Sequence, residues 1–247
     1  MIEIDGLKIN YIKYGLQKGN CIVLLHGWGQ NIEMMKMIGD RFQKSFQILI
    51  IDLPGHGKSS EPKTALQVVD FVNILEKLLK KLNIDNPILI GHSFGGKISL
   101  LYSSMYRTKK VVALASPFKQ EIPKLSFKVK VLKFLKKVPV INKLEGFAKR
   151  HMGSDDYRNA SGVMREILVN TVNCDITENV KTIKVPVLAI WGTEDKAVPV
   201  EEAFELEELI PDCGVVVYQG CSHYAYLERL DQTVRVIRNF LLRDMEE

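Results

Sequence analysis

The stretch Pro87-Ile88-Leu89-Ile90-Gly91-His92-Ser93-Phe94-Gly95-Gly96 decides the fold. An apolar run of strand length leads directly into a serine, and helical periodicity continues over residues 94–106. Gly91-His92-Ser93-Phe94-Gly95 fits G-x-S-x-G, the nucleophile elbow, in which a serine stands on a strained turn between a strand and a helix. Glycine two positions before and after the serine permits so tight a turn. We therefore predict that Ser93 is a catalytic nucleophile and not a structural turn residue.

Apolar runs of strand length alternate with segments of helical periodicity along most of the chain. Strands are expected at residues 21–25, 46–51, 87–91, 111–115, 186–190 and 214–218, and helices at 64–82, 94–106 and 226–242. Continuous Val, Ile and Leu runs are typical of strands that are covered on both faces. The alternation predicts a parallel sheet with helices on both sides. Residues 2–14 alternate in polarity around Asp5-Gly6, which predicts a hairpin on the sheet edge.

Residues 117–184 interrupt this rhythm, because they contain several helical runs and no strand-like run. The segment lies between two predicted strands, at the carboxyl end of the sheet, where open α/β sheets hold their ligands. We therefore predict a core domain made of residues 1–116 and 185–247. Residues 117–184 are predicted to form a helical cap over the site.

Five histidines are candidates for the base that activates Ser93. His223 follows the last predicted strand and precedes the final helix, which completes the chain order Ser, Asp, His. The other four are His26, His56, His92 and His151. The first two precede the serine and are expected to structure loops, the third is expected to be turned elsewhere by the elbow, and the fourth lies in the predicted cap. We therefore assign the base to His223.

The acid that holds this histidine is expected directly after the strand at 186–190. Glu194 and Asp195 compete for this role. The turn at Gly192 leaves Asp195 reaching inward, whereas Glu194 is expected at the surface beside Lys196. We predict that Asp195 fixes the imidazole tautomer and stabilises the imidazolium form.

An acyl-transfer site must also stabilise negative charge on an oxygen, and two backbone N–H groups commonly do this. One is expected to be the N–H of Phe94, directly after the nucleophile. The other is expected in His26-Gly27-Trp28-Gly29, after the strand at 21–25, and we choose the N–H of Trp28. The Trp28 ring has a second interpretation as an aromatic lid on the pocket, and the two roles are compatible.

These motifs resemble those of the α/β-hydrolase superfamily. The resemblance lies in residues 24–29, 52–59, 91–96 and 191–195 together with His223, and it covers almost the whole chain outside the cap. It implies an eight-stranded, mostly parallel sheet, a catalytic triad, and no metal or organic cofactor. Within the superfamily the chain is similar to small bacterial serine esterases and to carbon–carbon bond hydrolases of aromatic ring breakdown. It departs from many relatives by having Ser222, and not glycine, before the base histidine.

The function expected from these residues is a serine hydrolase, and first a carboxylesterase acting on small to medium acyl esters. A carbon–carbon bond hydrolase of the ring-cleavage-product type would use the same triad and stays open. A lyase acting by proton abstraction would need no acyl-enzyme. A non-catalytic ligand-binding module is disfavoured, because such a module has no need of all three triad groups.

Composition is typical of a globular protein: 46% of the 247 residues are hydrophobic and 26% are charged. The first residues show no basic stretch followed by an apolar run, so we expect no signal peptide and a cytoplasmic protein. The four cysteines show no metal-binding spacing and are expected to be free thiols. No motif supports nucleic-acid binding, and the oligomeric state cannot be inferred.

The predicted cap contains a strongly basic segment, residues 119–150, with ten basic and two acidic side chains. Apolar residues alternate with the lysines, which predicts an amphipathic helix. The first interpretation places its apolar side over the active site and its lysines in water. A membrane-surface contact and an acidic partner or anionic substrate stay open as alternatives. Flotation with anionic vesicles at low ionic strength tests them: the first interpretation predicts no binding, and binding would favour the membrane.

Overall fold

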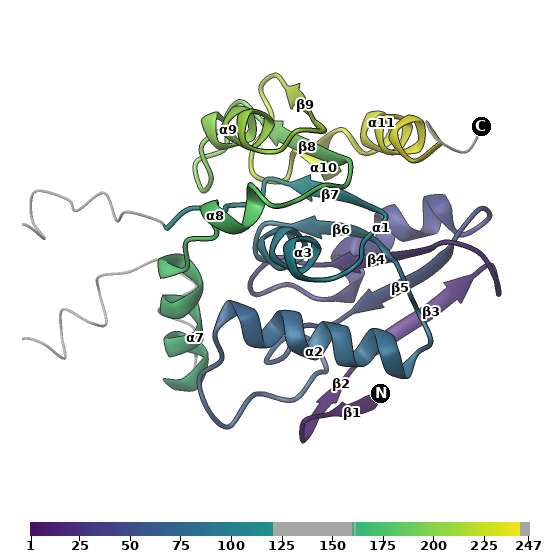
Figure 1. Ribbon diagram of the computed structural model, residues 1–247, viewed down its shortest axis with the longest axis vertical. Helices are drawn as coiled ribbons and strands as arrows, with labels where there is room; N and C mark the ends of the chain where they lie inside the picture. The colour runs from purple at the N-terminus through teal and green to yellow at the C-terminus, as the bar shows by residue number, and fades with distance from the viewer. Residues whose placement is uncertain (121–159, 161, 243–247) are drawn as a thin grey trace, which may run out of the picture.

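A computed structural model describes residues 1–120, 160 and 162–242 (Figure 1). Most of the predicted cap therefore lies outside the described residues, including His151 and nearly all of the basic segment. The domain boundaries stay a prediction.

A seven-stranded sheet forms the centre of the described structure. Its strand order is β3 (Tyr11–Gly15), β5 (Gln47–Ile51), β4 (Cys21–Leu25), β6 (Ile88–His92), β7 (Lys110–Leu114), β8 (Val187–Gly192) and β9 (Cys213–Tyr218). Every neighbouring pair is parallel except β3 with β5. The predicted mostly parallel sheet is confirmed, but the described residues form seven strands of it and not the eight that the resemblance implied.

The N-terminal residues account for one difference from the expectation. β1 (Ile2–Ile4) and β2 (Leu7–Ile9) form a hairpin with a turn at Asp5-Gly6, but this hairpin is a separate two-stranded sheet. The edge of the main sheet is β3, which runs antiparallel to β5. The hairpin instead buries Ile4 and Ile9 in the core that α2 shares, so its apolar residues pack on a helix and not in the sheet plane.

Helices cover both faces of the sheet, as the continuous apolar strands predict. On one face lie α2 (Val68–Lys81), α3 (Phe94–Met105), α8 (Thr177–Val180) and α9 (Glu201–Leu209). On the other lie α1 (Ile32–Phe42), α10 (Ala225–Glu228) and α11 (Leu230–Leu242). The remaining helix, α7 (Gly162–Asn173), lies beyond the carboxyl ends of the parallel strands (Figure 1).

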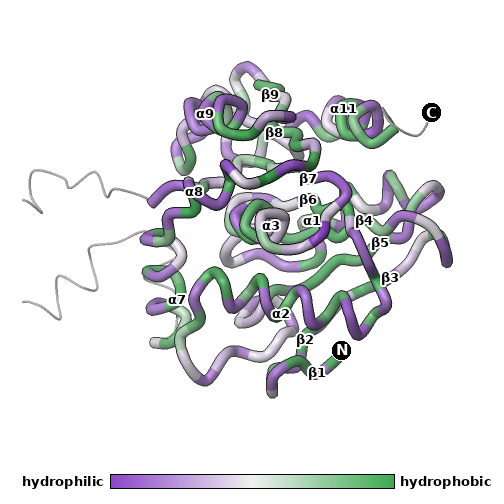
Figure 2. Tube along the Cα trace, viewed as in Figure 1, coloured by the Kyte–Doolittle hydropathy of each residue, from purple (hydrophilic) through white to green (hydrophobic). Residues whose placement is uncertain are grey.

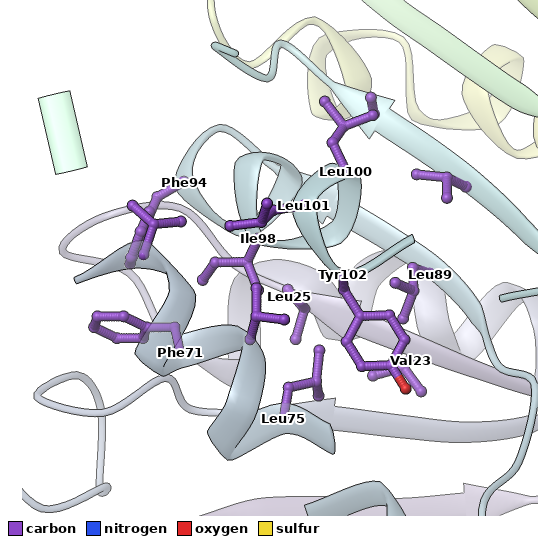
Figure 3. Close-up of a cluster of buried hydrophobic side chains, with 14 of the residues drawn as sticks. Val23, Leu25, Phe71, Leu75, Leu89, Phe94, Ile98, Leu100, Leu101 and Tyr102 are labelled. Carbon is purple, nitrogen blue, oxygen red and sulfur yellow. The ribbon is translucent and has the colours of Figure 1, made fainter. Parts of the chain in front are cut away.

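Each central strand contributes side chains to two separate cores. In β4, Val23 and Leu25 pack with α2 and α3, whereas Ile22 and Leu24 pack with α1 (Figure 3 shows the first core). The hydropathy along the chain agrees with this packing: the central strands are mostly apolar, and α2 alternates between apolar and polar turns (Figure 2). Burying each such aliphatic side chain stabilises the fold by about 1.5–3 kcal/mol. This packed framework fixes the loops at the carboxyl ends of β4, β6, β8 and β9, where the predicted site residues lie.

Candidate active site

Ser93 stands on a strained turn at the carboxyl end of β6. Its backbone dihedrals are φ 50° and ψ −113°, in a region that residues with a side chain rarely adopt. Such strain costs about 1–3 kcal/mol and persists only where the surroundings enforce it. Here the Ser93 N–H donates to the Leu114 carbonyl at 2.9 Å, and the Ser93 carbonyl accepts the N–H of Lys97 at 3.0 Å, which begins α3. The turn therefore lifts the hydroxyl above the sheet at the N-terminal end of a helix.

The flanking glycines are required by close backbone approach. A methyl group on Gly91 would overlap the Gly95 carbonyl, and one on Gly95 would lie 2.6 Å from the His26 carbonyl oxygen. Both contacts involve backbone atoms, which cannot move aside as the end of a flexible side chain would. The elbow is thus packed directly against the loop that follows β4, where the second oxyanion donor is predicted.

Asp195 and His223 meet across the loops that follow β8 and β9. The Nδ1 atom of His223 lies 2.8 Å from Asp195 Oδ2, and the Asp195 side chain is fully buried. The other carboxylate oxygen, Oδ1, accepts the N–H groups of Ala197 and Val198 at 2.8 and 2.9 Å. Three donors therefore fix the carboxylate, and the ring of His223 is fixed in turn with Nε2 directed away from Asp195.

Glu194, the competing carboxylate, is exposed. Its backbone N–H donates to the Cys221 carbonyl at 2.9 Å, so its main chain joins the acid loop to the base loop. The His223 ring contacts the carboxylate of Asp195 and not that of Glu194. The geometry pairs His223 with Asp195.

Ser222, the departure from many relatives, is bonded to Glu228 in α10. The Glu228 carboxylate accepts the Ser222 backbone N–H at 3.1 and 3.2 Å and also the Ser222 hydroxyl. The bond from the Ser222 hydroxyl is the largest cause that lowers the pKa of Glu228. The serine thus anchors the base loop to the following helix, a role that a glycine could fill only through its N–H.

Ser93 and His223 line one cavity of about 810 Å³, which is large enough for a small organic substrate. Trp28 and Phe94 also line it, with their ring centroids 5.6 Å apart. Its apolar lining includes Pro117, Leu168, Val172 and Val198. The structure thus brings all five predicted site residues to one place, with Asp195 behind His223, while their chemical roles stay predictions.

The other described histidines, His26, His56 and His92, are buried. His26 Nε2 accepts the N–H of Leu53 at 3.0 Å and its Nδ1 lies 2.7 Å from the Gly27 carbonyl, and burial lowers its pKa to about 4. His56 Nδ1 lies 3.0 Å from the Pro54 carbonyl. Both hold the loops at the carboxyl ends of β4 and β5, as the sequence led us to expect.

His92 contacts the loop that carries His223. Its ring borders the cavity, 4.7 Å from the His223 ring, and its Nε2 lies 3.1 Å from the His223 carbonyl. Burial, and secondly the neighbouring His223, lower the pKa of His92 to about 3, so it stays neutral. The elbow does turn it away from the position of the base, but it turns it toward the loop that carries the base.

Gln30 also lines the cavity, although no sequence motif indicates it. Its Oε1 accepts the Gly27 N–H at 3.0 Å, and its Nε2 donates to the Tyr224 hydroxyl at 3.2 Å. It therefore joins the predicted oxyanion loop to the loop of His223. The contact with Tyr224 spans 194 residues of sequence, so no local pattern indicates that the two loops are joined.

Among the residues that the structure describes, no group of three or more His, Cys, Asp or Glu side chains is arranged to hold a metal ion. The four cysteines are free thiols. No helix of the described ranges is both long and apolar enough to cross a membrane.

The sequence is similar to those of known hydrolases. The family model for the alpha/beta hydrolase fold matches residues 20–139. The chain is 25% identical to the pimeloyl-[acyl-carrier protein] methyl ester esterase of Aliivibrio fischeri, over 91% of this chain and 94% of that protein. It is also 25% identical to lipase 3 of a Moraxella species, over 96% of this chain and 82% of the lipase.

Among solved structures, Est816, described as an N-acyl homoserine lactone degrading enzyme, superimposes with a TM-score of 0.76 at 21% identity, over 97% of this chain and 99% of Est816. At that identity the likeness concerns the fold. The parallel sheet with its antiparallel edge strand, the elbow at the end of β6 and the sequence match together show that the chain has the α/β-hydrolase fold and is similar to the α/β-hydrolase superfamily.

Proposed function

We propose that the protein is a serine hydrolase that acts by acyl transfer, and specifically a carboxylesterase for small to medium acyl esters. The observation that carries the proposal is the His223–Asp195 pair, 2.8 Å apart, on the same cavity as a serine at a strained elbow. A buried carboxylate held by two backbone N–H groups has no need of a histidine for its own stability. Its contact with Nδ1 instead prepares Nε2 to accept a proton.

The proposed reaction follows from this geometry. His223 Nε2 takes the proton of Ser93 as its hydroxyl oxygen attacks the ester carbonyl, and Asp195 stabilises the resulting imidazolium. The N–H groups of Trp28 and Phe94 are the proposed donors to the oxyanion, aided by the N-terminal end of α3. His223 then protonates the departing alcohol, and water, activated by the same base, cleaves the acyl-enzyme.

The ester class is supported by the cavity and by the relatives. Leu168, Val172 and Val198 provide an apolar lining that suits an acyl chain. An esterase and a lipase are among the proteins to which the chain is similar over most of its length. We propose an uncharged acyl ester as the substrate and no cofactor.

A fluorophosphonate probe tests the activated serine directly. We expect a covalent adduct on wild-type protein, no adduct on Ser93→Ala, and slower labelling of His223→Ala, because a serine reacts with such probes only when a base activates it. The adduct must be located by mass spectrometry, since Ser222 lines the same cavity as Ser93. An adduct on Ser222, or no adduct when a known esterase is labelled in parallel, would contradict the proposal.

The reaction class needs a second measurement. Rates on a short aryl ester and on a vinylogous diketone from aromatic ring cleavage should be compared with the same enzyme preparation. We expect hydrolysis of the ester. If the probe labels Ser93 but the protein hydrolyses only the diketone, the triad assignment stands and the function is carbon–carbon bond hydrolysis.

A further inference from the structure

A buried lysine, Lys97, lies in the first turn of α3, on the same helix that Ser93 begins. Its side chain is fully buried and also borders the active-site cavity. Its Nζ donates to the carbonyl oxygens of Cys174, Thr171 and Lys119 at 2.8, 3.0 and 3.3 Å. An ammonium group has three N–H donors, so these carbonyls match its hydrogen-bonding capacity.

The three carbonyls belong to both ends of the insertion in the core. Lys119 lies where the chain leaves the core after β7, and Thr171 and Cys174 lie at the C-terminal end of α7, where the chain returns. The two ends are also joined directly, because the Ile176 N–H donates to the Phe118 carbonyl at 2.8 Å. Lys97 therefore joins the nucleophile helix to both ends of the insertion.

The position of Lys97 suits the C-terminal end of a helix. The last carbonyls of α7 have no partner within the helix and carry partial negative charge, which a cation stabilises. The nearby Asp175 also responds to Lys97: burial would raise the pKa of this carboxyl, but hydrogen bonds from Thr177 and Gln120, together with the charge of Lys97, outweigh burial and lower the pKa. A buried ammonium group destabilises the fold unless all its N–H donors are bonded. The three carbonyls must therefore stay close to the Lys97 Nζ atom, which fixes the C-terminal end of α7 relative to α3.

The helix that Lys97 holds is a wall of the cavity. Leu168, Thr171 and Val172 of α7 line the same cavity as Ser93 and His223. Leu168 and Thr171 are themselves buried, so α7 packs on the core as a unit. A shift of its C-terminal end would change the space available to an acyl chain beside Ser93.

We propose that Lys97 is a specificity-determining positioning residue: by holding the C-terminal end of α7, it sets the distance of this wall from Ser93 and thereby selects acyl chain length. The proposal rests on the proposed acyl transfer at Ser93. Lys97 does not bind the substrate, since its donors are engaged by backbone carbonyls.

The chain offers a matched control in a second buried lysine, Lys110 of β7. Its Nζ donates to the carbonyls of Phe240 and Leu241 at 2.7 and 3.4 Å, at the C-terminal end of α11, and it does not line the cavity. Lys97→Met and Lys110→Met therefore remove the same kind of buried helix-end contact. Only the first touches the wall of the active site.

The test compares kcat and KM for p-nitrophenyl acetate and p-nitrophenyl octanoate in wild type and both variants. We expect Lys97→Met to change the octanoate-to-acetate ratio of kcat/KM by about tenfold or more, since small displacements of a positioning element have large effects on reactivity. Lys110→Met should keep the ratio within about twofold of wild type, because remote losses of stability act on both substrates equally. Hydrogen exchange over residues 162–173 should accelerate in Lys97→Met alone.

An unchanged ratio in a folded Lys97→Met variant, or an equal change in Lys110→Met, would overturn the proposal. If Lys97→Met does not fold, Lys97→Gln, which keeps an N–H donor on a shorter side chain, is held to the same criteria. A wild-type protein that neither hydrolyses the esters nor reacts with the fluorophosphonate would overturn the proposed function and this inference together. An active wild type with an unchanged ratio in the variant overturns the inference alone.

Discussion

Replacing Ser93 with alanine is expected to lower kcat for a p-nitrophenyl ester by about 10⁶-fold, because loss of the nucleophile removes the whole covalent pathway. KM should change little, since the cavity walls stay in place. Stability should also be retained: the Ser93 side chain makes no capping hydrogen bond to α3, and alanine faces the same backbone strain at φ 50°. Steady-state kinetics and the thermal midpoint, measured on the same preparation, check both expectations.

The comparison is informative because activity and folding should separate. A loss of activity accompanied by a large fall in the thermal midpoint would indicate that Ser93 shapes the elbow and not the reaction. Residual activity above about 1% of wild type would also contradict the assignment, because a missing nucleophile leaves only the much smaller contribution of binding and the oxyanion hole. Residual activity that the fluorophosphonate inhibits would come from a contaminating serine esterase, so the residual rate must be measured with and without the probe.

The sheet could be predicted from the sequence because its strands are buried on both faces. Runs such as Cys21–Leu25, which the structure reproduces residue for residue, are continuous in Val, Ile and Leu and follow no helical period. The other strands were predicted to within two residues at each end, which is the usual uncertainty of element boundaries. The elbow can be predicted equally well, because the strand, the glycines, the serine and the helix are adjacent in the sequence.

Two helices were missed for physical reasons that the structure supplies. α1 contains Gly39, which weakens the helical signal, but a Cβ there would lie within about 3 Å of Ile48 and Ile50 side chains, so glycine lets the helix approach β5. α9 is rich in glutamate and buries only Ala203 and Leu206. The final helix, expected over 226–242, is divided by Arg229 into α10 and α11.

The contacts that organise the site could not have been predicted, because they join distant segments through backbone atoms. Lys97 bonds to carbonyls 74 and 77 residues away, and a carbonyl has no signature in the sequence. Asp52 behaves likewise: its carboxylate accepts the N–H groups of Ile32 and Lys58 and the side chain of Asn10, which fixes the loop after β5. Residue type indicates which groups are candidates for the chemistry, whereas the residues that position these groups become visible only in the fold.

Replacing Asp195 with asparagine is expected to lower kcat by about 10⁴-fold while the loop keeps its structure. The Asp195 Oδ1 atom accepts two backbone N–H groups, from Ala197 and Val198, so the asparagine oxygen should take that position. The asparagine NH₂ group then faces His223 Nδ1, which lies 2.8 Å from Oδ2 in the native site. An NH₂ donor requires a lone pair on Nδ1, which places the ring proton on Nε2, where it cannot accept the proton of Ser93.

Glu194→Gln is the matched control, because it makes the same chemical change in the adjacent residue, on an exposed side chain. Its kcat should stay within about threefold of wild type, the scale of an exposed charge change that leaves the site intact. Both variants should be compared with wild type for kcat, KM and thermal midpoint. A large loss in Glu194→Gln with a small one in Asp195→Asn would transfer the acid to Glu194. Equal, small losses in both would mean that His223 is oriented chiefly by its loop, through the bonds of Ser222 to Glu228 and of His92 to the His223 carbonyl.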